Sequence, residues 1–281
     1  MPVFLWPNSM SSKKREIPVF SHPIIETHCH LDYLKEHGLD EILTQCAKAN
    51  VERIITIGVS PDNLDTVLQL TGEAANIYGT LGVHPHDAEK FTGDTAAQIR
   101  EQAKQAKIVA IGEIGLDYYY EHSDRKTQQK VFETQLQIAC DLNLPVVIHS
   151  READADTQAI LQNFSSHLLR KGVIHSFTSG IDLAKFAIAD GYCLGFNGIC
   201  TFPKAENVRD IIRLTPPEHI LLETDSPYLT PVPYRGRENA PFYIPFVAEH
   251  VAAVKEISVE TLLPVVYQNS LRLFFPSAPA R

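Results

Sequence analysis

Residues 24–30 read Ile24-Ile25-Glu26-Thr27-His28-Cys29-His30. This short apolar run predicts a β-strand, and side chains two residues apart on a strand point in the same direction. His28 and His30 can therefore share one metal ion. Because two histidines at this spacing arise readily by chance among the 12 in the chain, the interpretation needs support from other residues.

Four further apolar runs end in a residue type that binds metal ions. They end at Glu113, His149, His175 and Asp225. If all five runs are parallel strands, these side chains meet at one rim with His28 and His30. For each histidine taken alone, a hydrogen-bonded position in the core or at the rim is the commoner explanation. The joint set favours a metal site.

Strand-like runs alternate with amphipathic helical patterns almost throughout the chain. Strands are predicted at 24–27, 53–58, 78–82, 108–113, 146–149, 173–175, 193–196 and 220–224. Helices are predicted near 39–50, 61–75, 94–106, 124–143, 152–168, 181–190, 205–213, 241–256 and 258–273. This alternation is typical of a (β/α)8 barrel and of a doubly wound open sheet. Only a closed barrel brings the first and eighth strands together, so the ligand set predicts an α/β protein with a (β/α)8 TIM barrel.

The length of 281 residues is compatible with a single barrel domain. We assign residues 23–275 to a TIM-barrel hydrolase domain and residues 276–281 to a C-terminal tail. Residues 1–22 form an N-terminal extension that we expect to be mobile. Its basic Lys13-Lys14-Arg15 follows the apolar residues 4–6, which is the reverse of the order in a signal peptide.

The composition narrows the class of protein further. A net charge of −9 argues against a protein that coats nucleic acid with a basic face, but not against an enzyme that meets phosphates through metal ions. Five cysteines without a C-x-x-C pair indicate neither a disulfide framework nor a zinc knuckle. No apolar stretch approaches the ~18 residues that span a membrane. We therefore expect a cytoplasmic protein that has no membrane partner and no obligate protein partner.

Six motifs resemble those of the TatD family of metal-dependent deoxyribonucleases, a branch of the amidohydrolase-like barrels. The motifs are Thr27-His28-Cys29-His30-Leu31-Asp32, Gly82-Val83-His84-Pro85-His86, Gly112-Glu113-Ile114-Gly115-Leu116-Asp117-Tyr118, Pro145-Val146-Val147-Ile148-His149-Ser150-Arg151, His175-Ser176-Phe177-Thr178-Ser179-Gly180 and Glu223-Thr224-Asp225-Ser226-Pro227-Tyr228-Leu229. The resemblance extends over about residues 24–275. Departures are small, such as Ser176 where a cysteine is common, and none affects an expected ligand.

The resemblance implies a centre of two divalent metal ions. The implied ligands are His28, His30 and Asp225 for the first ion, and His149 and His175 for the second, with Glu113 as the bridge. A carboxylate can bridge two cations whereas an imidazole cannot, and Glu113 is the only acid that ends the fourth run. Mixed nitrogen and oxygen ligands leave Mg, Mn, Zn and Ni as candidates. Glu113 and Asp225 are the expected catalytic carboxylates, with Asp225 also the general base.

Other residues near the expected site carry weaker signals. His84 and Arg151 could bind a scissile phosphate, although a packed turn or an ion pair would explain them as well. Residues 118–120 are three consecutive tyrosines, which could stack a nucleobase or pack into a rim loop. Glu223 shares the direction of Asp225 deeper in the barrel, where a supporting role is favoured.

The expected activity is hydrolysis of DNA phosphodiester bonds by a metal-activated water. We expect an exonuclease that acts on single-stranded DNA or on 3′ ends. The alternative is the same barrel hydrolysing a small ester, lactone or amide, or an aminoacyl-tRNA ester, since the same centre polarises a carbonyl as readily as a phosphoryl group. A non-catalytic binding scaffold is disfavoured by the complete ligand set.

Overall fold

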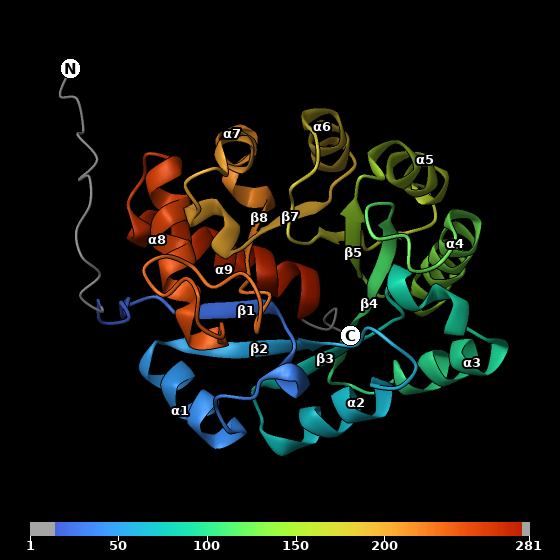
Figure 1. Ribbon diagram of the computed structural model, residues 1–281, viewed down its shortest axis with the longest axis horizontal. Helices are drawn as coiled ribbons and strands as arrows, with labels where there is room; N and C mark the ends of the chain where they lie inside the picture. Colours follow the sequence, from blue (N-terminus) through green and yellow to red (C-terminus); the bar gives the residue numbers. More distant parts are fainter. Residues whose placement is uncertain (1–14, 277–281) are drawn as a thin grey trace, which may run out of the picture.

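In the computed structural model, which describes residues 15–276, eight parallel strands pair in sequence order. The strands are β1 (Ile24–Cys29), β2 (Val51–Ile57), β3 (Ile77–Leu81), β4 (Ile108–Asp117), β5 (Val146–Arg151), β6 (Gly172–Ile174), β7 (Cys193–Phe196) and β8 (Ile220–Leu222). Figure 1 shows them in the middle of the molecule with the helices arranged around them.

Contacts between the two ends of the sheet close the barrel. Cys29 forms a parallel bridge with Ser226 just beyond β8, and the Thr27 hydroxyl donates to the carbonyl oxygen of Leu222 at 2.9 Å. The backbone N–H of Asp225 donates to the carbonyl oxygen of His28 at 2.9 Å. The predicted (β/α)8 TIM barrel is therefore confirmed, and the open doubly wound sheet is excluded.

The helices follow the predicted order. They are α1 (Leu39–Lys48), α2 (Leu64–Glu73), α3 (Gly93–Gln102), α4 (Arg125–Leu142), α5 (Asp154–Phe164), α6 (Ile181–Ala189), α7 (Glu206–Leu214), α8 (Ile244–Val254) and α9 (Val259–Phe274). Side-chain caps fix the starts of three helices, with Thr92 as the cap of α3. The Asp124 carboxylate accepts the backbone N–H groups of residues 126 and 127 at the start of α4, and the Ser258 hydroxyl accepts that of Thr261 in α9.

Strand β4 differs from its prediction, because it runs on past Glu113 to Asp117. The extension depends on Gly115, which has a φ of +140° and lies against β5. A Cβ atom at this position would be 2.0 Å from the carbonyl oxygen of His149, so only glycine permits the close approach of the two strands. Strands β6 and β8 end earlier than predicted, which leaves His175 and Asp225 just beyond them.

Alternate strand residues form a buried apolar group beneath the rim. It includes Val147 and Val173, which lie two residues before His149 and His175, and Phe274 of α9 packs against it. The side chains that end these strands are thus supported from below by close-packed apolar groups.

Residues 15–22 contact the barrel wall. The Arg15 guanidinium forms a bidentate ion pair with Glu249 of α8 at 2.6 and 2.8 Å, and Ile17 and Phe20 pack against the core. Most of the predicted extension, residues 1–14, and residues 277–281 of the predicted tail lie outside the described residues. Within residues 15–276, no helix combines the length and apolar character that crossing a membrane requires.

Candidate metal centre

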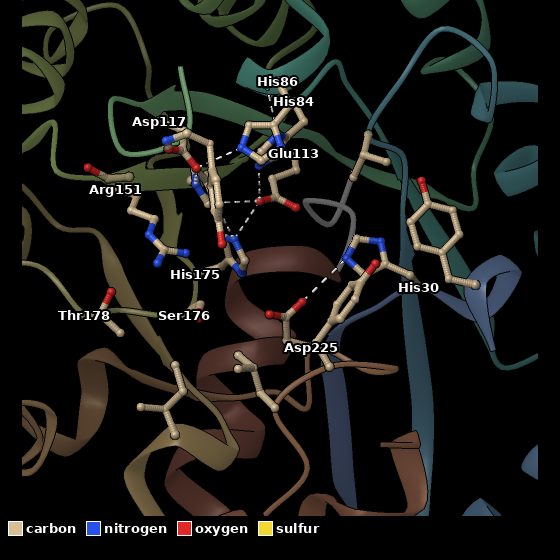
Figure 2. Close-up of a pocket in the computed structure, with 18 of the residues that line it drawn as sticks. His30, His84, His86, Glu113, Asp117, Arg151, His175, Ser176, Thr178 and Asp225 are labelled. Carbon is tan, nitrogen blue, oxygen red and sulfur yellow. Dashed lines mark hydrogen bonds and ion pairs between the residues drawn. The ribbon is translucent and has the colours of Figure 1, made fainter. Parts of the chain in front are cut away.

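A cavity of about 810 Å³ opens at the carboxyl ends of the strands. The predicted ligands His30, Glu113, His149, His175 and Asp225 line this cavity, as do the predicted phosphate-binding residues His84 and Arg151. The remaining predicted ligand, His28, lies beneath them and is 1% exposed. Figure 2 shows His30, Glu113, His175 and Asp225 converging on the cavity from different parts of the barrel.

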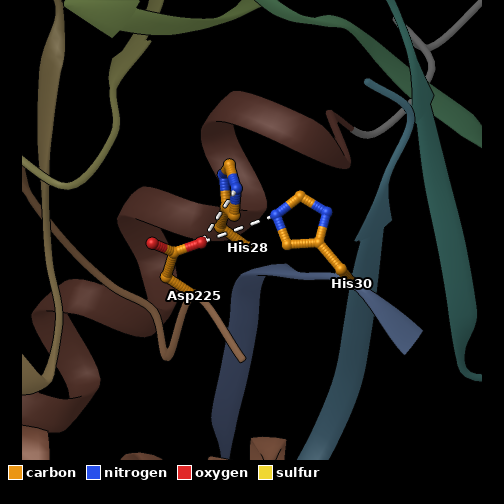
Figure 3. A group of neighbouring side chains, drawn as sticks. All are labelled: His28, His30 and Asp225. Atoms are coloured by element: carbon orange, nitrogen blue, oxygen red, sulfur yellow. Dashed lines mark ion pairs between the residues drawn. The ribbon is translucent and has the colours of Figure 1, made fainter. Parts of the chain in front are cut away.

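The first group of ligand-type residues joins β1 to the loop after β8. Asp225 Oδ1 lies 3.5 Å from His30 Nε2 and 3.7 Å from His28 Nε2 (Figure 3). The backbone N–H of Asp225 is held by the carbonyl oxygen of His28, and its φ of +58° is in the left-handed region that aspartate tolerates. These three side chains could hold one metal ion.

The second group surrounds the Glu113 carboxylate at the middle of the cavity. Its Oε1 atom lies 2.7 Å from His175 Nε2 and 3.1 Å from His149 Nδ1. Its Oε2 atom faces the other way and lies 3.4 Å from His28 Nε2. Each oxygen of Glu113 therefore faces a different set of histidines, which is the arrangement that a bridging carboxylate needs.

The spacing and chemistry of these groups fit divalent ions. Donor atoms around a tetrahedral ion bound at about 2.0–2.1 Å lie roughly 3.4 Å from one another. The separation of His149 Nδ1 and His175 Nε2 is 3.4 Å. Both ring nitrogens of buried His28 lack a hydrogen-bond partner among the described residues, and its ring stacks on that of His175 at 3.9 Å. An unsatisfied buried nitrogen is costly, and coordination would satisfy it.

The electrostatics keep the acids ionised. Burial opposes ionisation of Glu113, but His175 and His84 hold the pKa of this carboxyl well below its usual range. Burial likewise opposes ionisation of Asp225, and the contacts with His30 and His28 lower its pKa overall. Ionised carboxylates are the form that binds metal ions.

The histidines of the site fall into two groups according to the direction in which their pKa is shifted. Burial lowers the pKa of His28, and burial together with His149 lowers that of His84 to about 4, so both imidazoles are neutral at pH 7. Burial also opposes protonation of His30, His149 and His175, but the carboxylates beside them raise the pKa of each. An ion must displace protons from these rings, so metal binding should release protons.

Comparison with known proteins identifies the family to which the chain belongs. The model of the family described as TatD related DNase matches residues 25–275. The chain belongs to the TatD family. It is 38% identical over 261 residues to the uncharacterized metal-dependent hydrolase YcfH of Escherichia coli K12, covering 89% of this chain and 95% of that protein.

Two other TatD-family proteins are similar in sequence or structure. The 3′-5′ ssDNA/RNA exonuclease TatD of Cronobacter turicensis is 33% identical over 249 residues, covering 86% of this chain and 94% of that protein. The crystal structure of the TatD homologue YjjV of Escherichia coli K12 superimposes with a TM-score of 0.85 at 31% identity, covering 90% and 98%. The chain is accordingly a metal-dependent hydrolase of the TatD family.

Asp117, at the end of β4, supports this TatD-family centre and was missed by sequence reasoning. Its Oδ2 atom lies 3.1 Å from Nε2 of His149 and 2.9 Å from Nε2 of His86. A carboxylate on the outer nitrogen of a histidine fixes the ring and leaves the inner nitrogen free to bind metal. The signal available in the sequence was the alternation of side chains along a strand. If the fourth strand continues beyond Gly115, residues 113, 115 and 117 all point to the same face.

Two buried glutamates brace the centre from below. Glu223 Oε1 accepts the backbone N–H of Ser176 at 2.6 Å and lies 3.7 Å from Nδ1 of His175, in keeping with the supporting role expected for it. Glu26 Oε1 accepts the backbone N–H groups of His28 and Thr224, which ties β1 to the segment after β8. Burial raises the pKa of Glu26 to about 8. Glu26 was not among the predicted site residues.

The two predicted phosphate-binding residues lie in different surroundings. His84 Nε2 is 3.4 Å from Glu113 Oε1, and His84 forms with Glu113 and His149 a third cluster that could hold a metal ion. Arg151 is exposed at the rim, with its guanidinium over the rings of Tyr119 and Tyr120 at 4.3 and 4.9 Å. Arg151 is thus exposed to a substrate, whereas half-buried His84 lies against the Glu113 carboxylate.

Proposed function

We propose that this TatD-family hydrolase cleaves phosphodiester bonds of DNA at a centre of two divalent ions. The observation that carries the proposal is the position of Glu113, whose two oxygens face His28 on one side and His175 with His149 on the other. Two-metal sites of this kind serve in-line displacement at phosphorus.

The proposed ligands follow from these contacts. One ion would be held by His28, His30 and Asp225, and the other by His149 and His175, with Glu113 between them. When bound, the ions would activate a water molecule and neutralise charge on the phosphoryl oxygens. The ions could be Mg, Mn, Zn or Ni, and the nitrogen-rich donor set favours a transition metal over Mg.

The protein residues would move the proton and orient the phosphate. Asp225 lies at the edge of the cavity with 14% of its side chain exposed, so one of its oxygens can accept the proton of the attacking water. The Arg151 guanidinium can donate to the phosphate oxygens. The water oxygen would form the new P–O bond, the P–O bond to the leaving oxygen would break, and the leaving oxygen would take up a proton from solvent water. Neutral His84, beside Glu113, can bind the phosphate or support the second ion.

DNA is favoured as the substrate by two observations. A relative with 33% identity is described as a 3′-5′ exonuclease of single-stranded DNA and RNA. The cavity also presents cationic Arg151 and aromatic Tyr120, which suit a phosphate and a base. We therefore propose exonuclease action on single-stranded DNA or 3′ ends. Hydrolysis of a small ester, lactone, amide or aminoacyl-tRNA ester is the competing function.

The test is a substrate panel with metal-free enzyme to which Mg, Mn or Zn is returned separately. End-labelled single-stranded DNA should be shortened stepwise with at least one of these ions and left intact with none. An aryl ester and a lactone, assayed in parallel, should be hydrolysed far more slowly. Faster hydrolysis of the ester or lactone than of DNA would replace the proposal with the competing function.

A further inference from the structure

Three half-exposed tyrosines gather around the mouth of the cavity. Tyr119 and Tyr120 are 53% and 50% exposed on one side, and Tyr228 is 53% exposed beside His30 on the other. Tyr120 and Tyr228 line the cavity itself. Exposed aromatic rings beside a polar site leave apolar surface uncovered that a ligand could bury.

The first side carries four neighbouring side chains, which we call the rim platform: Tyr119, Tyr120, His122 and Arg151. The rings of Tyr120 and His122 are parallel within 4° at 5.7 Å, and the rings of Tyr119 and Tyr120 meet edge to face at 4.8 Å. The Arg151 guanidinium lies 4.3 Å from the centroid of the Tyr119 ring and 4.9 Å from that of the Tyr120 ring. All four side chains are exposed, so the platform presents aromatic rings and a cation to the solvent.

The loop under the platform is held rigidly. Asp117 Oδ1 accepts the backbone N–H groups of Tyr119 and Tyr120 at 3.0 and 2.9 Å. The Ser123 hydroxyl donates to the carbonyl oxygen of His86, and Gln128 donates to the carbonyl oxygen of Ser123. A surface whose backbone is fixed in advance loses little conformational entropy when it binds a ligand.

The platform is joined directly to the metal centre. The two oxygens of the Asp117 carboxylate serve different partners. Oδ1 accepts the tyrosine backbone N–H groups, and Oδ2 hydrogen-bonds the rings of His149 and His86. The His86 ring also contacts the Tyr120 ring edge to face at 5.4 Å. Tyr120, Arg151 and the ligand residues line one cavity, so a phosphate bound at the centre would have the platform beside it.

We propose that the rim platform stacks an unpaired base of single-stranded DNA, next to the phosphate at the metal centre, against Tyr120. Aromatic rings and an arginine guanidinium bind the π face that every base has, so recognition would be tolerant of sequence. In a duplex that face is covered by the neighbouring base pairs, so the platform selects single strands. The inference rests on the proposed nuclease function and adds the part of the substrate that is recognised.

The test uses metal-reconstituted enzyme and a short phosphorothioate DNA strand, which resists cleavage, with 2-aminopurine in place of single bases. Stacking quenches 2-aminopurine, so wild-type enzyme should quench it at one position and bind the strand. Tyr120→Ala should abolish the quenching and weaken binding roughly 5- to 150-fold, the range for loss of one base–aromatic stack. Tyr120→Phe keeps the ring and should behave as wild type.

Two controls separate stacking from general damage. Tyr267→Ala removes a tyrosine of α9 that hydrogen-bonds Glu52 far from the cavity, and should bind like wild type. Replacing the stacked nucleotide by an abasic one should bring wild type down to the affinity of Tyr120→Ala. Equal binding and quenching by Tyr120→Ala and wild type would overturn the proposal.

Cleavage of the unmodified strand distinguishes this inference from the nuclease proposal. An enzyme that stacks 2-aminopurine through Tyr120 but leaves ordinary DNA intact with every metal would support the platform and refute the nuclease activity. An enzyme that cleaves DNA and an abasic strand equally well, without quenching, would support the nuclease and refute the platform.

Discussion

Replacing Asp117 by asparagine should weaken metal binding at the Glu113–His149 side of the centre by about 10- to 100-fold, the usual cost of losing a partner behind a metal ligand. This corresponds to about 1.4–2.8 kcal/mol. In the wild type, Nε2–H of His149 donates to Asp117 Oδ2, which leaves Nδ1 with a lone pair facing Glu113 and His175.

Neither orientation of the asparagine preserves this arrangement. With its NH₂ toward His149, the amide offers a donor where an acceptor is needed, and the ring shifts its proton to Nδ1, the nitrogen that should bind metal. With its oxygen toward His149, the NH₂ faces the backbone N–H groups of Tyr119 and Tyr120, and unsatisfied donors cost about 1–3 kcal/mol each.

The assay is competition between metal-free protein and a chromophoric chelator for Zn or Mn, with the melting temperature of the metal-free protein as the check on folding. Asp156→Asn is a matched control, because Asp156 also accepts hydrogen bonds near this rim, from Tyr118 and Gln129, but contacts no histidine of the centre. The reasoning would be refuted if Asp117→Asn bound two ions as tightly as the wild type and the Asp156→Asn control do.

Three further substitutions test other parts of the account. Asp225→Asn should fold and keep most of its metal. Its kcat for cleavage of end-labelled DNA should fall about 10²–10⁴-fold, as expected for the loss of a general base. Arg151→Ala should raise KM for DNA without changing the ion content by elemental analysis, because Arg151 is exposed at the rim outside the ligand set. Gly115→Ala should lower the free energy of unfolding, followed by denaturant titration, by about 3 kcal/mol or more, since its Cβ would lie 2.0 Å from the carbonyl oxygen of His149.

Each of these substitutions has an outcome that contradicts its premise. Near-wild-type turnover in Asp225→Asn would leave Asp225 as a ligand only, with His84 the next candidate for the base. Metal loss in Arg151→Ala would show that this residue supports the centre and not the substrate. A Gly115→Ala variant as stable as wild type would mean that β4 and β5 do not need their close approach.

The features predictable from sequence were those that depend on local periodicity. Each expected ligand ends an apolar run. If these runs are parallel strands, their carboxyl ends lie at the same rim of the barrel, and so do the ligands. Barrel closure could also be inferred, because His28 and Asp225 share an ion only if the first and eighth strands are neighbours. The contact between them, from the Asp225 N–H to the His28 carbonyl oxygen, is found in the structure.

The features that escaped prediction depend on contacts between segments. Asp117 supports His149 only because β4 continues past Gly115, and that continuation depends on how closely β5 approaches. Glu26 lies within the first predicted strand, yet one of its two partners is the backbone N–H of Thr224, which follows the eighth strand. The position of His84 beside Glu113 is set by a loop that has no periodic pattern.

Stepwise titration of metal ions into metal-free enzyme, with cleavage of end-labelled single-stranded DNA measured after each addition, tests the central claim most directly. We predict little cleavage after the first equivalent and a rise to full activity as about the second equivalent binds, since Glu113 would join two ions in one reaction centre. Full activity at one equivalent, or cleavage that persists in excess chelator, would contradict it.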